Sequence, residues 1–150
     1  MIRRFGEPPE PGRKYTRRVG AYALLERDGA LLLTLQEDPG PELQLPGGGI
    51  DPGESPIAAL HREVHEETGW SISDPCRVGA FRRFTYMPEY DLYAEKICLI
   101  YLARPARRHG PPIEPGHSAV WLPPSEAARL LGNSGDRHFA AALARGLSSA

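Results

Sequence analysis

Three glutamates stand at a spacing that could do chemistry. Glu66 and Glu67 follow Glu63 by three and four positions. On an α-helix this spacing places three carboxylates on one face, within about one turn. Like charges at these positions repel, and each pair costs roughly 0.2–0.5 kcal/mol of helix stability. Carboxylate oxygens suit hard cations, so the cluster predicts a site for Mg²⁺ or Mn²⁺ rather than for zinc.

A magnesium site of this kind predicts a reaction class. Protein-bound Mg²⁺ usually keeps several waters and is shared with substrate phosphates. Such an ion neutralises a diphosphate, lowers the pKa of a bound water and holds that water in line with phosphorus. The three glutamates therefore predict metal-assisted hydrolysis of a phosphoanhydride bond.

The glutamates belong to a longer pattern that starts with a glycine-rich turn. It reads Gly48, five residues, Glu54, seven residues, and then Arg62-Glu63-Val64-His65-Glu66-Glu67-Thr68-Gly69-Trp70. This pattern resembles the Nudix box, G-x5-E-x7-R-E-U-x-E-E-x-G-U with U a bulky apolar residue, at every specified position. The resemblance continues upstream through Leu45-Pro46-Gly47 and more loosely over residues 17–131. It implies hydrolysis within the diphosphate of a nucleoside diphosphate linked to another group.

The resemblance implies roles for individual positions of the box. Glu63, Glu66 and Glu67 resemble the metal ligands, and the backbone carbonyl of Gly47 resembles a further ligand. Hydrolases of this family use Mg²⁺ or Mn²⁺, which the resemblance therefore implies as the cofactor.

A second pair of box positions resembles a support for those ligands. Arg62 and Glu54 match the supporting pair, in which the planar fork of the arginine holds acidic groups in place.

The general base is left open by the sequence. In several family members a glutamate in the loop before the last strand takes the proton from the attacking water, and in others a box glutamate does. The corresponding loop, residues 111–121, carries a single carboxylate, Glu114, with His117 close by. Glu114 is the candidate base outside the box, and His117 is a weaker one.

The residues that bind the rest of the substrate are expected near an aromatic cluster around residues 84–93. Stacking of a nucleobase on an aromatic ring is worth about 1–3 kcal/mol, although core packing explains each ring equally well. Adjacent residues on a strand point to opposite faces, so only one of Arg82 and Arg83 can face a phosphate. The candidate substrate-binding residues are Arg18, Gln44, Arg83, Tyr86 and Tyr90.

The helix that carries the glutamates has clear ends. Ser55 fits an N-cap and Pro56 the first helical position. Gly69 fits the left-handed residue that closes a helix. At 100° per residue, one stripe should face the core. Its members are Ile57, Leu60, Val64 and Thr68, and Ala59 falls on the neighbouring glutamate stripe, where it leaves room for ions.

The remaining patterns predict an α/β fold. Strands are expected over 19–26, 30–36, 42–45, 76–86, 92–103 and 119–122, with a turn at 46–49, a proline-rich loop at 104–116, and helices over 125–131 and 137–147. The apolar run 97–102 should be a central strand. Strands on both sides of one crossover helix favour a mixed sheet with helices on both faces. The resemblance implies the Nudix-type α/β/α sandwich.

Composition limits the alternatives. With 150 residues, 41% hydrophobic and 25% charged, the chain should form one domain over 17–150. Residues 1–16 read as a flexible, proline-rich basic arm. The net charge of −1 argues against a nucleic-acid or membrane partner. No apolar run reaches 18 residues, which together with two cysteines, read as free buried thiols, favours a cytoplasmic protein.

Three functions stay open from the sequence. The leading hypothesis is a hydrolase acting on nucleotide sugars, nucleoside triphosphates or dinucleoside polyphosphates. The alternative is a non-catalytic, nucleotide-sensing domain of the same fold, although such domains typically lose box carboxylates and this chain has lost none. A third is nucleic-acid binding by the basic arm, which no extended basic patch accompanies. The arm could also pack on a partner subunit in a homodimer.

Overall fold

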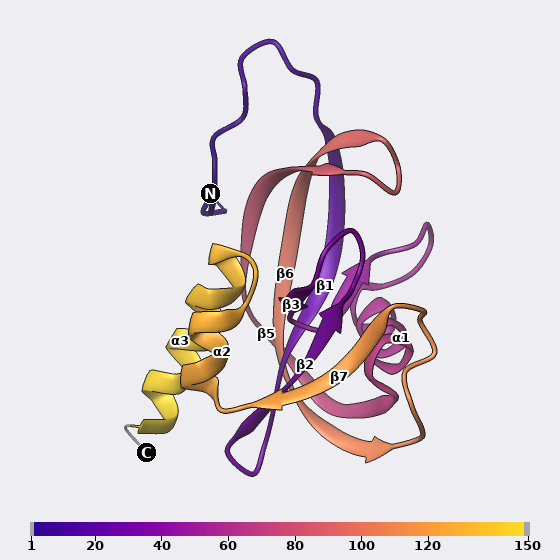
Figure 1. Cartoon of the computed structure of the whole chain (residues 1–150), viewed down its shortest axis with the longest axis vertical. Helices are drawn as coiled ribbons and strands as arrows, with labels where there is room; N and C mark the ends of the chain where they lie inside the picture. The colour runs from indigo at the N-terminus through magenta and orange to yellow at the C-terminus, as the bar shows by residue number, and fades with distance from the viewer. Residues whose placement is uncertain (1, 149–150) are drawn as a thin grey trace.

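The computed structural model of the chain describes residues 2–148, and within them it contains seven strands and three helices (Figure 1). The elements are β1 Thr16–Arg27, β2 Ala30–Gln36, β3 Glu42–Gln44, β4 Gly47–Gly49, α1 Pro56–Thr68, β5 Trp70–Met87, β6 Leu92–Arg108, β7 His117–Leu122, α2 Pro124–Leu130 and α3 Ser134–Ser148.

The strands form a mixed sheet, as predicted. Their order is β3-β2-β1-β6-β5, with β4 paired to β1 and β7 paired to β2. The pair β1–β6 is parallel, whereas β1–β2, β1–β4, β2–β3, β2–β7 and β5–β6 are antiparallel. The apolar run 97–102 lies in β6, between β1 and β5, which confirms it as a central strand.

Helices cover both sides of the sheet (Figure 1). One buried cluster joins α1 to the sheet through residues such as Leu60, Val64 and Leu99. A second cluster joins α2 and α3 to the other side, and Phe81 and Leu131 belong to it. This arrangement is the predicted α/β/α sandwich, and it places α1 beside β4 and β1.

The ends of α1 are those predicted from the sequence. The Ser55 hydroxyl accepts a hydrogen bond from the Ala58 amide at 3.1 Å. Gly69 has φ +79° and closes the helix by donating its amide to the His65 carbonyl. The length of the helix that carries the glutamates is thus set by local chemistry.

The predicted inner stripe of α1 is partly wrong. Leu60, Val64 and Thr68 are buried, but Ile57 is 43% exposed. The buried face of α1 instead includes Ala59, together with one of the glutamates, so it is turned from Ile57 toward the glutamate stripe. The reason is that α1 packs not only on β1 and β5 but also on β4 and β7. Ala59 is fully buried and does not border open space for ions.

Two segments predicted as turn or loop extend the sheet. Gly47–Gly49 is strand β4, paired with β1 at Gly20–Tyr22, rather than part of a turn. Strand β6 continues to Arg108, although 104–116 was expected to be a loop. Pro105 is tolerated there because it lies next to a register shift in the β5–β6 ladder, where proline does not break regular pairing.

The N-terminal segment makes contacts along β5. The backbone of Arg4 forms an isolated parallel β-bridge with that of Arg82, and the Phe5 amide donates to the Arg82 carbonyl at 2.9 Å. The Phe5 ring also lies edge-on to Phe81, with centroids 5.6 Å apart. The division into an arm over 1–16 and a domain over 17–150, and the flexibility of that arm, stay predictions.

The two cysteines differ in environment. Cys98 is buried, as expected, but Cys76 is exposed because its strand lies at the edge of the sheet. None of the helices in the described part of the chain is long and apolar enough to cross a membrane.

Candidate functional site

Strand β4 and α1 approach each other closely at the centre of the site. The Gly47 amide of β4 donates a hydrogen bond to Glu67 Oε1 at 2.9 Å. A side chain on Gly48 would collide with Glu63, because its Cβ would lie 2.5 Å from the Glu63 carboxyl carbon. Gly47 has φ +149°, and a Cβ there would lie 2.1 Å from the Ala21 carbonyl oxygen. Only glycines let the backbone of β4 lie against the two carboxylates.

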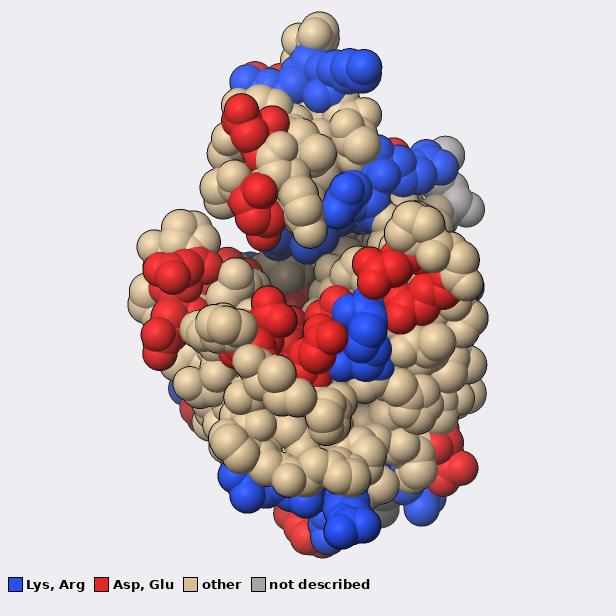
Figure 2. All heavy atoms as spheres, turned by 90° about the vertical axis from the view of Figure 1, so that its right-hand side faces the viewer, with Lys and Arg blue, Asp and Glu red and all other residues tan. Residues whose placement is uncertain are grey.

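Two of the three glutamates share a pocket with β4. Glu63 and Glu67 line a cavity of about 230 Å³ together with Gly47 and Glu114. Figure 2 shows acidic side chains on both sides of a hollow in this face of the molecule. The structure therefore brings together residues from β4, α1 and the loop before β7, as the sequence predicted.

Glu66 is placed differently. Its side chain is 32% exposed and is not part of the pocket lining. Its backbone carbonyl accepts hydrogen bonds from the Ile113 and Glu114 amides, both at 2.8 Å. Glu66 thus holds the loop that carries Glu114, and its carboxylate lies at the rim, within reach of Arg62 Nη1 at 3.4 Å.

Arg62 ties the acidic residues together. Its guanidinium donates to both carboxylate oxygens of Glu54 at 2.8 Å, to Glu63 Oε1 at 2.9 Å and to the Gly49 carbonyl at 3.1 Å. The hydrogen bonds from Arg62 are the main reason that the pKa of Glu54 falls to about 2. The same contacts raise the pKa of Arg62. The predicted supporting pair is present as a bidentate pair.

Burial shifts the pKa values of the two pocket glutamates. It raises the pKa of Glu63 and raises that of Glu67 well above its ordinary value. The hydrogen bond from the Gly47 amide opposes this shift at Glu67, whereas the nearby Glu63 and Glu114 carboxylates add to it. A cation placed beside Glu67 would reverse the shift, because an opposite charge favours the ionised form.

The donor set fits a hard divalent cation. Glu67 is buried, and across residues 2–148 the only basic side chain within ion-pairing distance of it is His117, whose Nδ1 lies 3.9 Å from Oε2. A buried carboxylate normally has a cationic partner or a metal. Within the same residues no three acidic, histidine or cysteine side chains already form a metal-binding group. Arg62 accounts for part of this, since it engages oxygens of Glu63 and Glu66.

His117, the weaker of the two candidate bases outside the box, lies close to the centre of the site. Its Nδ1 is 2.9 Å from the Thr34 hydroxyl, and burial lowers its pKa. Glu114 is separated from α1 in sequence by β5 and β6, but its amide donates to the Glu66 carbonyl and the residue lines the same pocket. Both candidates for the base are therefore present at the site.

The predicted substrate-binding residues separate into two groups. Gln44, Arg83 and Tyr90 line the pocket. The Arg18 guanidinium is outside the lining and stacks on the Tyr90 ring at 4.4 Å. Tyr86 lines a neighbouring hollow, where its hydroxyl donates to Asp91.

The far end of the pocket contains residues to which no sequence pattern pointed. Tyr22 from β1, Lys96 from β6 and Asp136 from α3 line it. Burial raises the pKa of Asp136 to about 6. The signal that could have found Lys96 is a lone cation next to the apolar run 97–102, since charges are rare in central strands.

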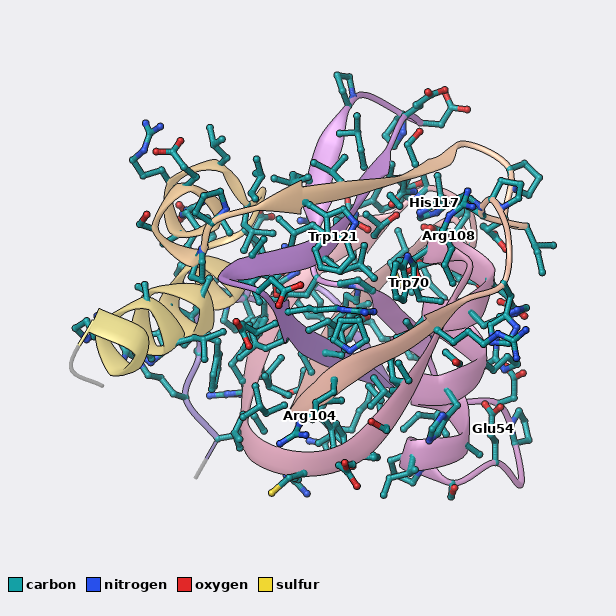
Figure 3. The ribbon with its side chains drawn as sticks, turned by 90° about the horizontal axis from the view of Figure 1, so that it is seen from below. Glu54, Trp70, Arg104, Arg108, His117 and Trp121 are labelled. Carbon is teal, nitrogen blue, oxygen red and sulfur yellow. The ribbon has the colours of Figure 1, made fainter. Side chains whose placement is uncertain are left out.

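Below the site, two tryptophans close the space between β5 and β7. Figure 3 shows Trp70 and Trp121 pointing toward each other, with Glu54 beside the start of α1 and His117 at the start of β7. Their ring centroids are 5.5 Å apart at 78°, an edge-to-face contact. This pair packs the strand that carries His117 onto the strand that follows α1.

Comparison with known proteins gives one family. A family model described as "NUDIX domain" matches residues 14–143. Nucleoside triphosphatase NudI of Escherichia fergusonii is 31% identical over 71% of this chain and 82% of its own length. A putative 8-oxo-dGTP diphosphatase of Bacillus subtilis is 32% identical over 49% of this chain. An RNA pyrophosphohydrolase of Acidiphilium cryptum is 48% identical over 37% of this chain.

The matched lengths differ among these relatives. The aligned part spans half of the Bacillus subtilis protein and 35% of the Acidiphilium cryptum protein. Among solved structures, a MutT NUDIX hydrolase from Burkholderia pseudomallei superposes with TM-score 0.63 at 24% identity, covering 73% of this chain and 85% of its own. A MutT protein from Bacillus halodurans superposes with TM-score 0.67 at 22% identity, covering 82% and 79%. These two likenesses concern the fold.

Proposed function

The chain belongs to the NUDIX family, and on that premise we propose that it hydrolyses a phosphoanhydride bond in a nucleoside diphosphate linked to another group. We propose Mg²⁺ or Mn²⁺ as its cofactor. NUDIX enzymes act on small nucleotides and generally use divalent metals, and the named relatives act on nucleoside triphosphates or on RNA. The family membership supports the reaction class, and the pocket supports its location.

One observation carries the proposal. Glu67 is a buried carboxylate with no lysine or arginine in ion-pairing distance within residues 2–148, and it lies beside Glu63 and the backbone of Gly47. Leaving such a charge unpaired is costly, and a divalent cation would offset that cost. The same pocket would therefore hold a divalent cation and the diphosphate that such a cation binds.

The residues have distinct proposed tasks. Glu63, Glu66, Glu67 and the Gly47 carbonyl would hold the metal, which supplies charge neutralisation and an activated water when bound. Arg62 keeps Glu63 in position through its fork to Glu54, so the carboxylate meets the cation without a large rearrangement. Glu66 is outside the pocket lining, so its side chain would have to turn away from Arg62 to serve as a ligand.

Glu114 is the proposed general base. Its carboxylate lines the pocket, and the hydrogen bonds from the 113–114 backbone to the Glu66 carbonyl hold its loop against α1. His117 is anchored by Thr34 and lies beside Glu67, which suits it to orient that carboxylate rather than to accept a proton. A box glutamate as the base is the alternative, and the effect of Glu114→Gln on kcat distinguishes the two.

A nucleotide panel tests the proposed function. Nucleotide sugars, nucleoside triphosphates and dinucleoside polyphosphates are incubated with the protein and Mg²⁺ or Mn²⁺, and the products are identified by mass spectrometry. We expect metal-dependent cleavage within the phosphate chain of at least one class. If metal binds, as measured by calorimetry, but no compound is cleaved, the proposal is wrong and the protein is a nucleotide-sensing domain of the same fold.

A further inference from the structure

We propose that Arg83 and Lys96 form a second anion subsite of the same pocket, which binds a phosphoryl group beyond the diphosphate held at the carboxylates. The substrate is then a nucleotide with a chain of three or more phosphates rather than a nucleotide sugar. This inference rests on the proposed function and selects among the substrate classes that it leaves open.

The two cations face each other across neighbouring strands. Arg83 on β5 and Lys96 on β6 are register partners in the antiparallel ladder. Directly opposed residues point to the same face of a sheet, and like charges in that relation are destabilising. Both side chains line the pocket that contains Glu63 and Glu67, and both also line the hollow next to it. A like-charged pair that faces a cavity is a place for an anion.

Neither cation has a carboxylate partner of its own. Across residues 2–148, the ten ion pairs involve neither Arg83 nor Lys96. The group that most affects Lys96 is the phenol of Tyr22, with which it shares a hydrogen bond. Asp136 is near enough to be affected by both cations, but its carboxylate accepts from the Leu45 amide.

Arg83 and Lys96 differ in charge from most other ionisable residues of the pocket lining. Its lining contains six carboxylates and two cationic side chains, Arg83 and Lys96. An anionic substrate is repelled by such a pocket except at a bound metal and at this pair. Phosphoryl oxygens that the metal does not reach therefore have only Arg83 and Lys96 as charged partners among the lining residues.

The number of cations matches a terminal phosphate. A terminal phosphate carries roughly −1.5 to −2 charges near neutral pH, whereas the diphosphate of a nucleotide sugar is esterified at both ends and lacks that group. Two cations without carboxylate partners supply the opposite charge. Charge-assisted hydrogen bonds from guanidinium and ammonium groups are also the strongest that a phosphate accepts.

The test measures binding, so that it does not depend on turnover. Two methylene-bridged, non-hydrolysable analogues of one nucleoside are titrated calorimetrically in the presence of Mg²⁺: a triphosphate analogue, and a diphosphate analogue whose far end is esterified to a sugar. Lys96→Met and Arg83→Met should each weaken binding of the triphosphate analogue by roughly 10- to 100-fold. The diphosphate analogue should change by less than about threefold. Lys96→Arg, which keeps the charge, should recover most of the triphosphate binding.

Controls separate this inference from the proposed function. Lys14→Met and Arg104→Met remove exposed cations outside the pocket lining and should leave both affinities unchanged. Thermal unfolding of each variant checks that it is folded, and Arg83→Met decides the test if Lys96→Met is not. An equal loss for both analogues, or no loss for the triphosphate analogue, overturns the subsite. If the wild-type protein cleaves nothing but the binding difference is found, the proposed function fails and the subsite stands.

Discussion

The guanidinium of Arg62 donates two hydrogen bonds to the carboxylate of Glu54, from Nε to Oε2 and from Nη2 to Oε1, both at 2.8 Å. The same guanidinium reaches Glu63 through Nη1 at 2.9 Å. Glu54 belongs to the loop before α1, whereas Glu63 is in the helix and lines the pocket. The planar fork therefore fixes a pocket carboxylate relative to the loop.

Arg62→Lys tests whether this fork, rather than the charge alone, matters. Lysine keeps the positive charge but cannot bind both Glu54 oxygens and Glu63 at once. We expect kcat/KM to fall roughly 10- to 100-fold, as is common when a group that orients a metal ligand is lost. Steady-state kinetics at several Mg²⁺ concentrations measure this. Arg129→Lys, which alters an exposed pair with Glu126, is the control and should have no effect; full activity of Arg62→Lys would contradict the role.

Glu66→Gln tests the metal ligands. The side chain is 32% exposed, so the neutral amide is tolerated and the protein should stay folded. We expect metal-dependent turnover to be abolished and the rise in melting temperature caused by Mg²⁺ to shrink, because a ligand that binds more weakly stabilises the folded state less. Differential scanning calorimetry with and without Mg²⁺ checks the second point. Wild-type turnover at saturating Mg²⁺ would refute the assignment. The control variant is Glu126→Gln, because Glu126 lies outside the pocket lining whereas the exposed Glu89 is part of it.

Asp136 should make stability depend on pH. Burial raises its pKa from 3.8 to about 6, so the folded protein holds this proton more tightly than the unfolded chain. Its contribution to the free energy of unfolding is full below pH 3.8 and is lost as pH rises through 6, a total of about 3 kcal/mol. Asp136→Asn should lack this slope, whereas the exposed Asp74→Asn should retain it. Urea unfolding between pH 4 and 7 decides, and parallel curves for wild type and Asp136→Asn would contradict the prediction.

Gly69→Ala and Gly53→Ala form a matched pair for the end of α1. Both glycines have φ +79°, so both variants lose about 1–2 kcal/mol from the left-handed backbone. At Gly69 the new Cβ would lie 1.9 Å from the Gly110 carbonyl oxygen, whereas at Gly53 no atom lies within 4 Å. We expect Gly69→Ala to lose roughly 1–3 kcal/mol more than Gly53→Ala in denaturant unfolding, because the neighbouring backbone must move. Equal losses of stability in the two variants would show that the backbone at Gly110 moves aside without an energetic cost.

Local patterns were sufficient for α1 and for the sheet class. Ser55 and Gly69 set the helix ends through contacts with residues at most four positions away, so sequence spacing alone contains the answer. The apolar run 97–102 likewise predicted the central strand. By contrast, Gly47–Gly49 and the end of β6 are strands because of partners more than twenty residues distant, and local sequence indicated turn and loop.

The sequence by itself determined which carboxylates exist, their spacing on one helix and the metal chemistry that such oxygens favour. The tertiary structure decided which of them share a pocket: Glu63 and Glu67 are inside, and Glu66 stands at the rim. It also decided that Lys96 lies opposite Arg83. The physical reason is that spacing along a helix fixes direction about its own axis only, whereas burial and charge pairing depend on what the rest of the chain packs against that axis.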